Sequence, residues 1–150
     1  MELSIVGRSK ERKDIIEKVA KFYLTQLNLD SFKHTVIISL KPQLCKETNS
    51  NGYFIKICDG LYQIILDSRL EITQCLRTLA HELVHLKQSV RGQYQTKINK
   101  NGKPARYWLG KKVNKPYHKQ PWELEAFRRE EELLDTLFAH IAQKKKKQKR

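Results

Sequence analysis

The chain has 150 residues, of which 39% are hydrophobic and 31% are charged, and its formal net charge is +14. This length and apolar content suit one domain with a single core of normal size. No run approaches the roughly 18 apolar residues of a membrane span, and the N-terminus lacks the apolar segment of a secretory signal. The composition therefore excludes a membrane protein and predicts a cytoplasmic, intracellular one.

The cysteines support the same compartment. Cys45, Cys58 and Cys75 are odd in number and show no CxxC spacing. Because Cys58 and Cys75 fall within apolar patterns, we expect buried free thiols, as in a reducing environment. A structural zinc site rich in cysteine is not expected.

The first half of the chain predicts a helix followed by three strands. Residues 9–28 have the apolar spacing of an amphipathic helix. Residues 34–40, 53–58 and 61–67 are typical of strands. Asp59-Gly60, between the last two strands, strongly favours a tight hairpin.

Residues 71–90 predict a helix that carries the motif HExxH, as His81-Glu82-Leu83-Val84-His85. Histidines four residues apart share one helical face, so both imidazoles can bind one Zn²⁺. Glu82 then lies beside the metal, where it can take a proton from bound water. Both histidines project away from the apolar stripe of the helix, which favours metal ligation over burial in the main core. A pair of exposed surface histidines is the other alternative.

A second hairpin is expected between the metal-binding segments. Residues 93–99 and 105–109 form its strands, and Asn101-Gly102 can take the positive φ values of a tight turn. We expect this insertion, residues 93–110, to overhang or wall the active-site cleft.

The helix that opens at Pro121 is expected to supply the third metal ligand. A catalytic zinc usually has three protein ligands and an open position for water. Glu123 lies near the middle of the apolar stripe, where a carboxylate needs a partner, whereas Glu125 points towards solvent. Glu130 is an alternative ligand or an acid that orients one. An acid also suits a helix N-terminus, which is the other explanation for Glu123. Ala126 is small enough to let two helices approach closely.

These motifs resemble those of the small SprT-like metallopeptidases of phage and bacterial genomes, which belong with the minimal gluzincins. The resemblance covers residues 70–140 and rests on HELVH, on the Tyr-Trp-Leu-Gly segment 107–110, on Tyr117 and on Pro-Trp-Glu-Leu-Glu-Ala at 121–126. It implies His81, His85 and Glu123 as zinc ligands and Glu82 as catalytic acid and base. The chain departs from SprT and Spartan proteases proper, which have a third His and a cysteine-bearing zinc ribbon.

The expected fold is therefore α+β, a zincin-like single domain over residues 1–143. A small antiparallel or mixed sheet packs on the HExxH helix and on the C-terminal, Glu-bearing helix. Residues 144–150 contribute six positive charges and predict a disordered basic tail. We expect a monomer.

The expected function is a zinc-dependent metallopeptidase that hydrolyses peptide bonds of a protein or peptide substrate with metal-activated water. Glu82 accepts the proton of the water and later protonates the leaving amine. Tyr117, Tyr107 and His118 are candidates for an oxyanion donor, and Tyr117 is preferred because it lies just before the Glu123 helix. We also expect residues 61–67 to form an edge strand that holds an extended substrate, with an ordinary sheet strand as the alternative.

The second expectation is a non-enzymatic nucleic-acid-binding protein with a structural zinc site. Segment 91–119 holds nine Lys and Arg residues with interleaved aromatics and no acid, and the tail 144–150 adds more charge. Such a surface suits non-specific binding of nucleic acid, in the nucleoid or the nucleus. A structural site should be closed by a fourth ligand, for which Cys45, Cys58 and His118 are the candidates.

Overall fold

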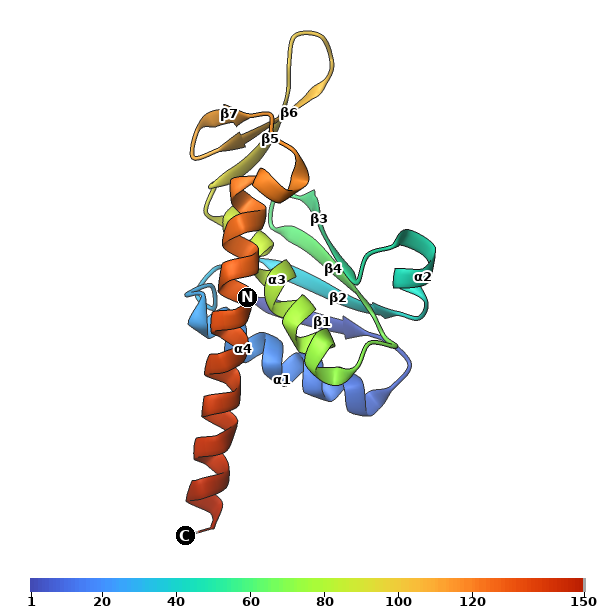
Figure 1. Cartoon of the computed structure of the whole chain (residues 1–150), viewed down its shortest axis with the longest axis vertical. Helices are drawn as coiled ribbons and strands as arrows, with labels where there is room; N and C mark the ends of the chain where they lie inside the picture. Colours follow the sequence, from blue (N-terminus) through green and yellow to red (C-terminus); the bar gives the residue numbers. More distant parts are fainter. Residues whose placement is uncertain (150) are drawn as a thin grey trace.

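A four-stranded sheet and the helices around it form the body of the protein, and a second, smaller sheet stands at one end (Figure 1). The computed structural model describes residues 1–149. The class is α+β, as predicted, and the larger sheet is mixed. The elements, in chain order, are β1 (Glu2–Val6), α1 (Lys10–Gln26), β2 (Thr35–Lys41), α2 (Leu44–Thr48), β3 (Gly52–Cys58), β4 (Leu61–Asp67), α3 (Ile72–Val90), β5 (Tyr94–Ile98), β6 (Pro104–Trp108), β7 (Lys111–Val113), the 3₁₀ turn η1 (Tyr117–Lys119) and α4 (Pro121–Gln148).

The strand order of the large sheet is β1-β2-β4-β3. β1, β2 and β4 are parallel to one another, and β3 is antiparallel to β4. The predicted turn at Asp59-Gly60 joins β3 to β4, and Gly60 has φ +82° there. The expectation that 61–67 is the edge strand was wrong, because β4 lies between β2 and β3. The edge strands are β1 and β3, and β3 is the one beside β4. The pairing of β4 with β2 joins distant parts of the chain, so local patterns could not reveal it.

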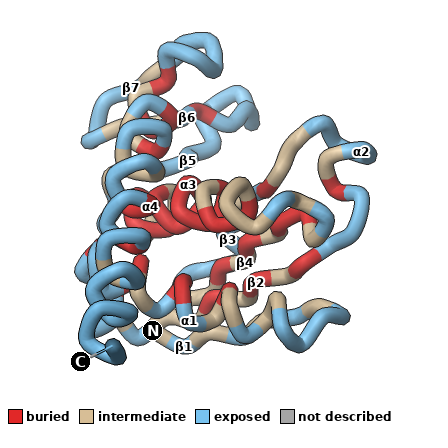
Figure 2. The backbone as a smooth tube through the Cα atoms, turned by 60° about the horizontal axis from the view of Figure 1, so that its bottom comes forward, coloured by how far each residue is buried: buried red, intermediate tan, exposed pale blue. Residues whose placement is uncertain are grey.

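One face of this sheet carries the core. Alternate residues of β2 and β4 are buried, and they meet α1 and α3, while α4 packs across both helices (Figure 2). Leu79 and Leu83 of α3 are fully buried, and each such side chain stabilises the fold by about 1.5–3 kcal/mol. Ala126 of α4 is also fully buried and permits the predicted close approach of α3 and α4.

The predicted second hairpin is confirmed and gains a third strand. β5 and β6 pair around a turn in which Gly102 has φ +74°, and β7 pairs with β6 across Leu109-Gly110, both with positive φ. Tyr94 packs on Trp122 at 4.9 Å between ring centroids, and the ring centroid of Trp108 lies 6.5 Å from that of Trp122. These aromatic contacts attach the small sheet to the first turn of α4.

Two further expectations differ from the structure. α4 continues through Gln148, so residues 144–148 are helical instead of a disordered tail; residue 150 lies outside the described residues. Lysine is a good helix former, which lets the helix run on past the core. Cys58 is exposed, because it lies at an irregularity of edge strand β3, whereas Cys75 is buried as expected. None of the described helices is long and apolar enough to span a membrane.

Candidate metal centre

Helix α3 presents His81 and His85 one turn apart. Their rings are 4.9 Å apart and nearly perpendicular, and 10% and 14% of the two side chains is exposed. The opposite side of α3 is anchored in the core through Leu79, Leu83 and Leu86. This division of the helix between an apolar face and a histidine face is the one that the apolar spacing predicted.

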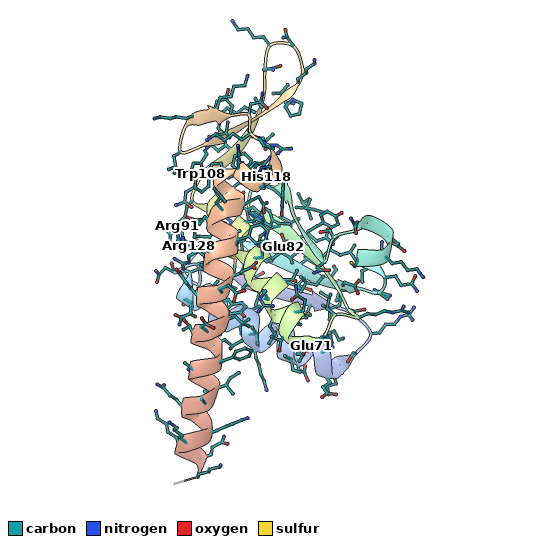
Figure 3. All side chains as sticks on the ribbon, in the orientation of Figure 1. Glu71, Glu82, Arg91, Trp108, His118 and Arg128 are labelled. Atoms are coloured by element: carbon teal, nitrogen blue, oxygen red, sulfur yellow. The ribbon has the colours of Figure 1, made fainter. Side chains whose placement is uncertain are left out.

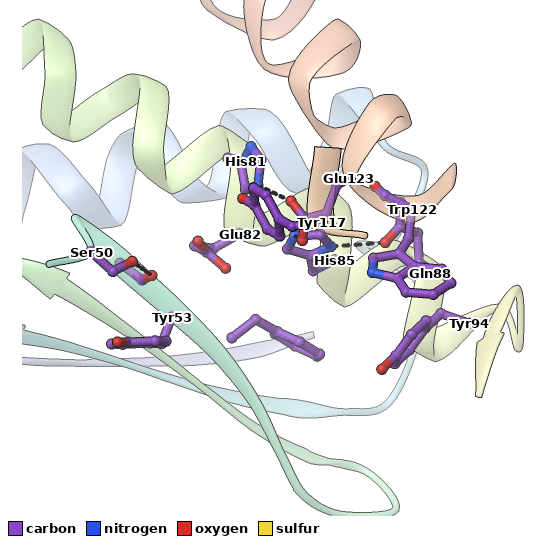
Figure 4. Close-up of a pocket in the computed structure, with 12 residues that line it drawn as sticks. Ser50, Tyr53, His81, Glu82, His85, Gln88, Tyr94, Tyr117, Trp122 and Glu123 are labelled. Carbon is purple, nitrogen blue, oxygen red and sulfur yellow. Dashed lines mark hydrogen bonds and ion pairs between the residues drawn. The ribbon is translucent and has the colours of Figure 1, made fainter. Parts of the chain in front are cut away.

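Glu123 comes to the histidines from the first turn of α4. Pro121 occupies the start of that helix, where its missing N–H costs no hydrogen bond. The two carboxylate oxygens of Glu123 lie 3.1 Å from His81 Nε2 and 3.0 Å from His85 Nε2. Figure 4 shows the three side chains gathered at one side of a pocket. Glu123 therefore faces both histidines, which a carboxylate that only capped the helix would not do.

The geometry of these three residues fits a metal ion. One ligand atom from each of His81, His85 and Glu123 can be chosen so that all lie within 4.8 Å of one another. In a tetrahedral zinc site, with bonds of about 2.0–2.2 Å, two ligand atoms are separated by roughly 3.3 Å. The observed nitrogen–oxygen distances are close to this spacing, so small side-chain shifts would complete the site. Two imidazoles and one carboxylate form a donor set that zinc accepts.

Each histidine is also held from behind. His81 Nδ1 lies 2.7 Å from Glu130 Oε2, and His85 Nδ1 lies 2.9 Å from the Oε1 atom of Gln88. Both partners are acceptors, so each Nδ1 carries a proton and, in a neutral ring, each Nε2 keeps its lone pair for a metal. The structure thus gives Glu130 the orienting position that was one of its two predicted roles. Gln88 was not predicted.

Gln88 links the two helices of the site. Its side chain is buried, and its amide nitrogen donates hydrogen bonds to the carbonyl of Trp122 at 2.9 Å and to Glu125 at 3.1 Å. Both are acceptors, which fixes the amide oxygen towards His85. Lys87 completes the network with an ion pair of 2.7 Å to Glu125. The expectation that Glu125 points to solvent was wrong, because α3 packs against that side of α4. The spacing of Gln88, three residues after His85, was the available signal.

The charges in the site are strongly coupled. Burial by itself lowers the pKa of His81, but hydrogen bonds to Glu123 and Glu130 outweigh it and raise that pKa to about 9. The pKa of His85 is raised as well, since the bond to Glu123 outweighs burial. Burial acts to raise the pKa of Glu123, yet the two histidines hold it well below its usual range. Without metal, protons on the imidazoles thus offset the buried carboxylate.

Glu82 faces the cavity beside the histidines. The cavity measures about 290 Å³, and the part nearest the site is bounded by α3, by the start of α4 and by residues of β3 (Figure 4). Among the described residues, no group forms a hydrogen bond or an ion pair with the Glu82 carboxylate. Burial raises its pKa above the ordinary range for a glutamate. Glu82 is therefore placed to exchange a proton with a molecule bound in the cavity.

Tyr117 is the only one of the three predicted oxyanion donors that lines this cavity in the described part of the chain. It belongs to η1, and its ring lies 6.3 Å from Phe127 in an edge-on arrangement. Burial and the nearby Glu123 raise the pKa of Tyr117 to about 12, so its hydroxyl remains a proton donor at neutral pH. Tyr107 lies under Lys97 on the small sheet, and His118 is exposed on η1 (Figure 3).

The residues predicted as a fourth ligand of a structural zinc site do not lie with the two histidines and Glu123. In residues 1–149, the cluster with metal-binding geometry comprises His81, His85 and Glu123. Cys45, Cys58 and His118 are not part of it. The side of the cluster that faces the cavity is open to a small molecule.

No protein-family model, no curated protein and no solved structure matches the chain.

Proposed function

We propose that the protein is a zinc-dependent peptidase with the zincin-like arrangement of SprT-like enzymes. One observation carries the proposal: an unpaired, buried carboxylate, Glu82, lies in a cavity directly beside a His-His-Glu group that fits a metal. A zinc ion that only joined α3 to α4 would have no use for this acid. The open side of the group also suits catalysis better than a closed structural site.

The proposed reaction divides its work among three kinds of group. His81, His85 and Glu123 would hold the zinc, which supplies positive charge that makes water acidic near neutral pH and offsets the charge of the transition state. Glu82 takes the proton of the attacking water and returns it to the departing amine. Tyr117 donates a hydrogen bond to the oxygen of the peptide carbonyl as negative charge develops there.

The edge strand β3 supports the binding of an extended peptide. Gly52, Tyr53 and Phe54 line the cavity that holds Glu82, and β3 has no neighbouring strand on its outer side among the described residues. Unpaired backbone groups of an edge strand can add a peptide as a further strand. We assign to β3 the substrate-binding role that the sequence had suggested for residues 61–67.

The test is the variant Glu82→Gln in the zinc-loaded protein, with a fluorescence-quenched casein as substrate. Glutamine preserves the shape of the side chain but cannot accept the proton, so we expect cleavage to fall by roughly 10²–10⁴-fold while one zinc per chain is retained. Near-native cleavage by the variant would remove the proposed base. Wild type that binds zinc but cleaves neither casein nor a peptide library would reject the peptidase.

A second candidate function is binding of nucleic acid by the small sheet. The nine Lys and Arg residues of segment 91–119 are all exposed, and none forms an ion pair with an acid among the described residues. The side chains of the small sheet spread outward at one end of the molecule, whereas Arg91 lies near Arg128 (Figure 3) and over the ring of Phe32. A single-stranded oligonucleotide should bind with an affinity that falls steeply as salt rises. An affinity that is independent of salt would contradict this function.

A further inference from the structure

A groove continues from the metal pocket between the two sheets. The groove is lined by Phe54, Ile55 and Lys56 of β3 on one wall and by Tyr94, Gln95, Thr96 and Lys97 of β5 on the other. Ser89 of α3 also lines it. The groove measures about 730 Å³. Phe54 and Tyr94 also line the metal pocket, so the two spaces adjoin. A ligand that leaves the pocket in this direction enters the groove.

Both walls are edges of sheets. β3 is an outer strand of the large sheet, and β5 is an outer strand of the small one. Consecutive residues of a strand point to opposite faces, so a groove lined by consecutive residues runs along the edge of each strand and not over its face. Among the described residues, no backbone hydrogen bond joins β3 to β5. Each wall therefore offers unpaired backbone groups.

The groove is positively charged. Its lining contains Lys56 and Lys97 and no acid. Lys97 lies over the ring of Tyr107, at 4.9 Å from its centroid, and is exposed. Lys56 forms an ion pair of 2.8 Å with Asp59, whose side chain is 97% exposed. Since a pair this exposed contributes little stability, a ligand carboxylate can replace Asp59.

We infer that the substrate of the proposed peptidase enters this groove as an extended, acidic peptide segment, which pairs with the edges of β3 and β5 and places carboxylates near Lys56 and Lys97. The inference rests on the proposed function. A polypeptide is favoured over a nucleic acid because only a polypeptide has amide groups to pair with strand edges. The acidic side chains belong about two to four residues from the cleaved bond, since Lys56 lies two residues beyond Phe54 and a strand rises about 3.3 Å per residue.

The first experiment measures binding without turnover. The probes are two fluorescent peptides of equal length, one of alternating Glu and Thr and one of alternating Gln and Thr, and the protein is the zinc-loaded Glu82→Gln variant. We expect the Glu peptide to bind about tenfold more tightly than the Gln peptide, and Lys56→Glu with Lys97→Glu to abolish this preference. N-methylation of alternate amides of the Glu peptide should weaken binding as well, because it removes backbone donors.

The matched control is Lys111→Glu with Lys112→Glu on β7, which makes the same change of charge outside the groove. This control should keep the preference for the Glu peptide. Equal affinity for both peptides, or equal loss in both double variants, would overturn the inference in favour of general attraction by a basic protein. Competition by an oligothymidylate that depends on Lys56 and Lys97, with no effect of N-methylation, would overturn it in favour of nucleic acid.

A second experiment separates this inference from the proposed function. Wild-type protein is incubated with a peptide library derived from a proteome, and the cleavage sites are read by mass spectrometry. Enrichment of Asp and Glu on one side of the cut, lost in the Lys56→Glu and Lys97→Glu variant, is the expected result. Cleavage without such enrichment would reject the acidic groove alone. Selective binding of the Glu peptide without any cleavage would reject the peptidase alone.

Discussion

Two regions of the molecule differ in how their charged side chains are paired. One is the site formed by α3 and α4, and the other is the small sheet β5-β6-β7. In the site, every ionisable side chain except Glu82 contacts a partner, as in the contacts of His81 with Glu123 and Glu130. On the small sheet, basic side chains stand in solvent, and none forms an ion pair with an acid among residues 1–149. Under the proposed functions the difference separates two tasks: the buried site would hold its geometry for chemistry, and the exposed sheet would attract a partner. Glu82 is the exception, and it is the residue to which we assign the proton transfer of the proposed reaction.

After Glu82→Gln, the largest loss of activity is expected from substitution of Tyr117, which lies between the two regions. Tyr117→Phe removes only the hydroxyl, so zinc should be retained while kcat falls by roughly 10²–10³-fold, as for loss of one oxyanion donor. The measurement is steady-state cleavage of quenched casein beside zinc stoichiometry. Tyr107→Phe, on the small sheet, serves as the control with unchanged kcat. Unchanged kcat in Tyr117→Phe would exclude the hydroxyl from the reaction.

Substitution of Gln88 should lower activity less than substitution of Tyr117, but it should clearly weaken zinc binding. Gln88→Ala leaves His85 Nδ1 without its acceptor and removes the bond from the Gln88 amide to the Trp122 carbonyl, and we expect zinc to bind about 10–100-fold more weakly. Unfolding should also become easier by roughly 1–3 kcal/mol. Gln88→Glu restores an acceptor to His85 and should recover part of the zinc affinity without recovering stability. Equal zinc affinity in wild type and Gln88→Ala would show that Gln88 does not orient His85.

The paired charges of the site predict that the stability of the metal-free protein depends on pH. In the metal-free protein the pKa of His81 is raised to about 9, above its ordinary value, because Glu123 and Glu130 outweigh burial. The protonated form therefore stabilises the fold fully below about pH 6.5, and this stability is lost as the pH rises through about 9. The melting temperature in EDTA should fall over that interval.

Zinc should reverse this trend, because it binds the neutral imidazoles and no longer competes with protons at high pH. The rise in melting temperature on adding zinc should therefore grow from pH 6 to 9. A zinc effect that is constant with pH would contradict protonation of the two histidines in the metal-free site.

The smallest expected effect is on oligonucleotide binding by the small sheet. Lys111→Glu with Lys112→Glu should lower the salt dependence of oligonucleotide binding by about two units of slope, since each lysine neutralises about one phosphate. Zinc content and peptide cleavage should not change. A loss of zinc in this variant would show that the two regions are coupled.

The sequence predicted the parts of the site that follow helical periodicity. HExxH on one face of 71–90 and Glu123 on the apolar stripe of the next helix needed only the spacing within each helix. The contacts of Gln88 and Glu125 were not predicted, because their burial depends on how α3 and α4 pack against each other. On isolated helical wheels, Glu125 faces solvent.

The strands were predicted as segments but not as a sheet. The turn at Asp59-Gly60 located β3 and β4, while the parallel pairing of β4 with β2 is a contact across the α2 region that no local signal encodes. Short β1 and β7, with 5 and 3 residues, were missed. The exposure of Cys58 follows from β3 being the edge strand, and it was mispredicted for the same reason.

The most direct test of the metal centre is zinc stoichiometry by native mass spectrometry, on wild type beside Glu123→Ala. Glu132→Ala, an exposed acid on the same helix, is the matched control. We predict one zinc per chain in wild type and in Glu132→Ala, and loss or clear weakening of zinc in Glu123→Ala. Wild-type protein that binds no zinc under metal-replete conditions would contradict both the metal centre and the peptidase built on it.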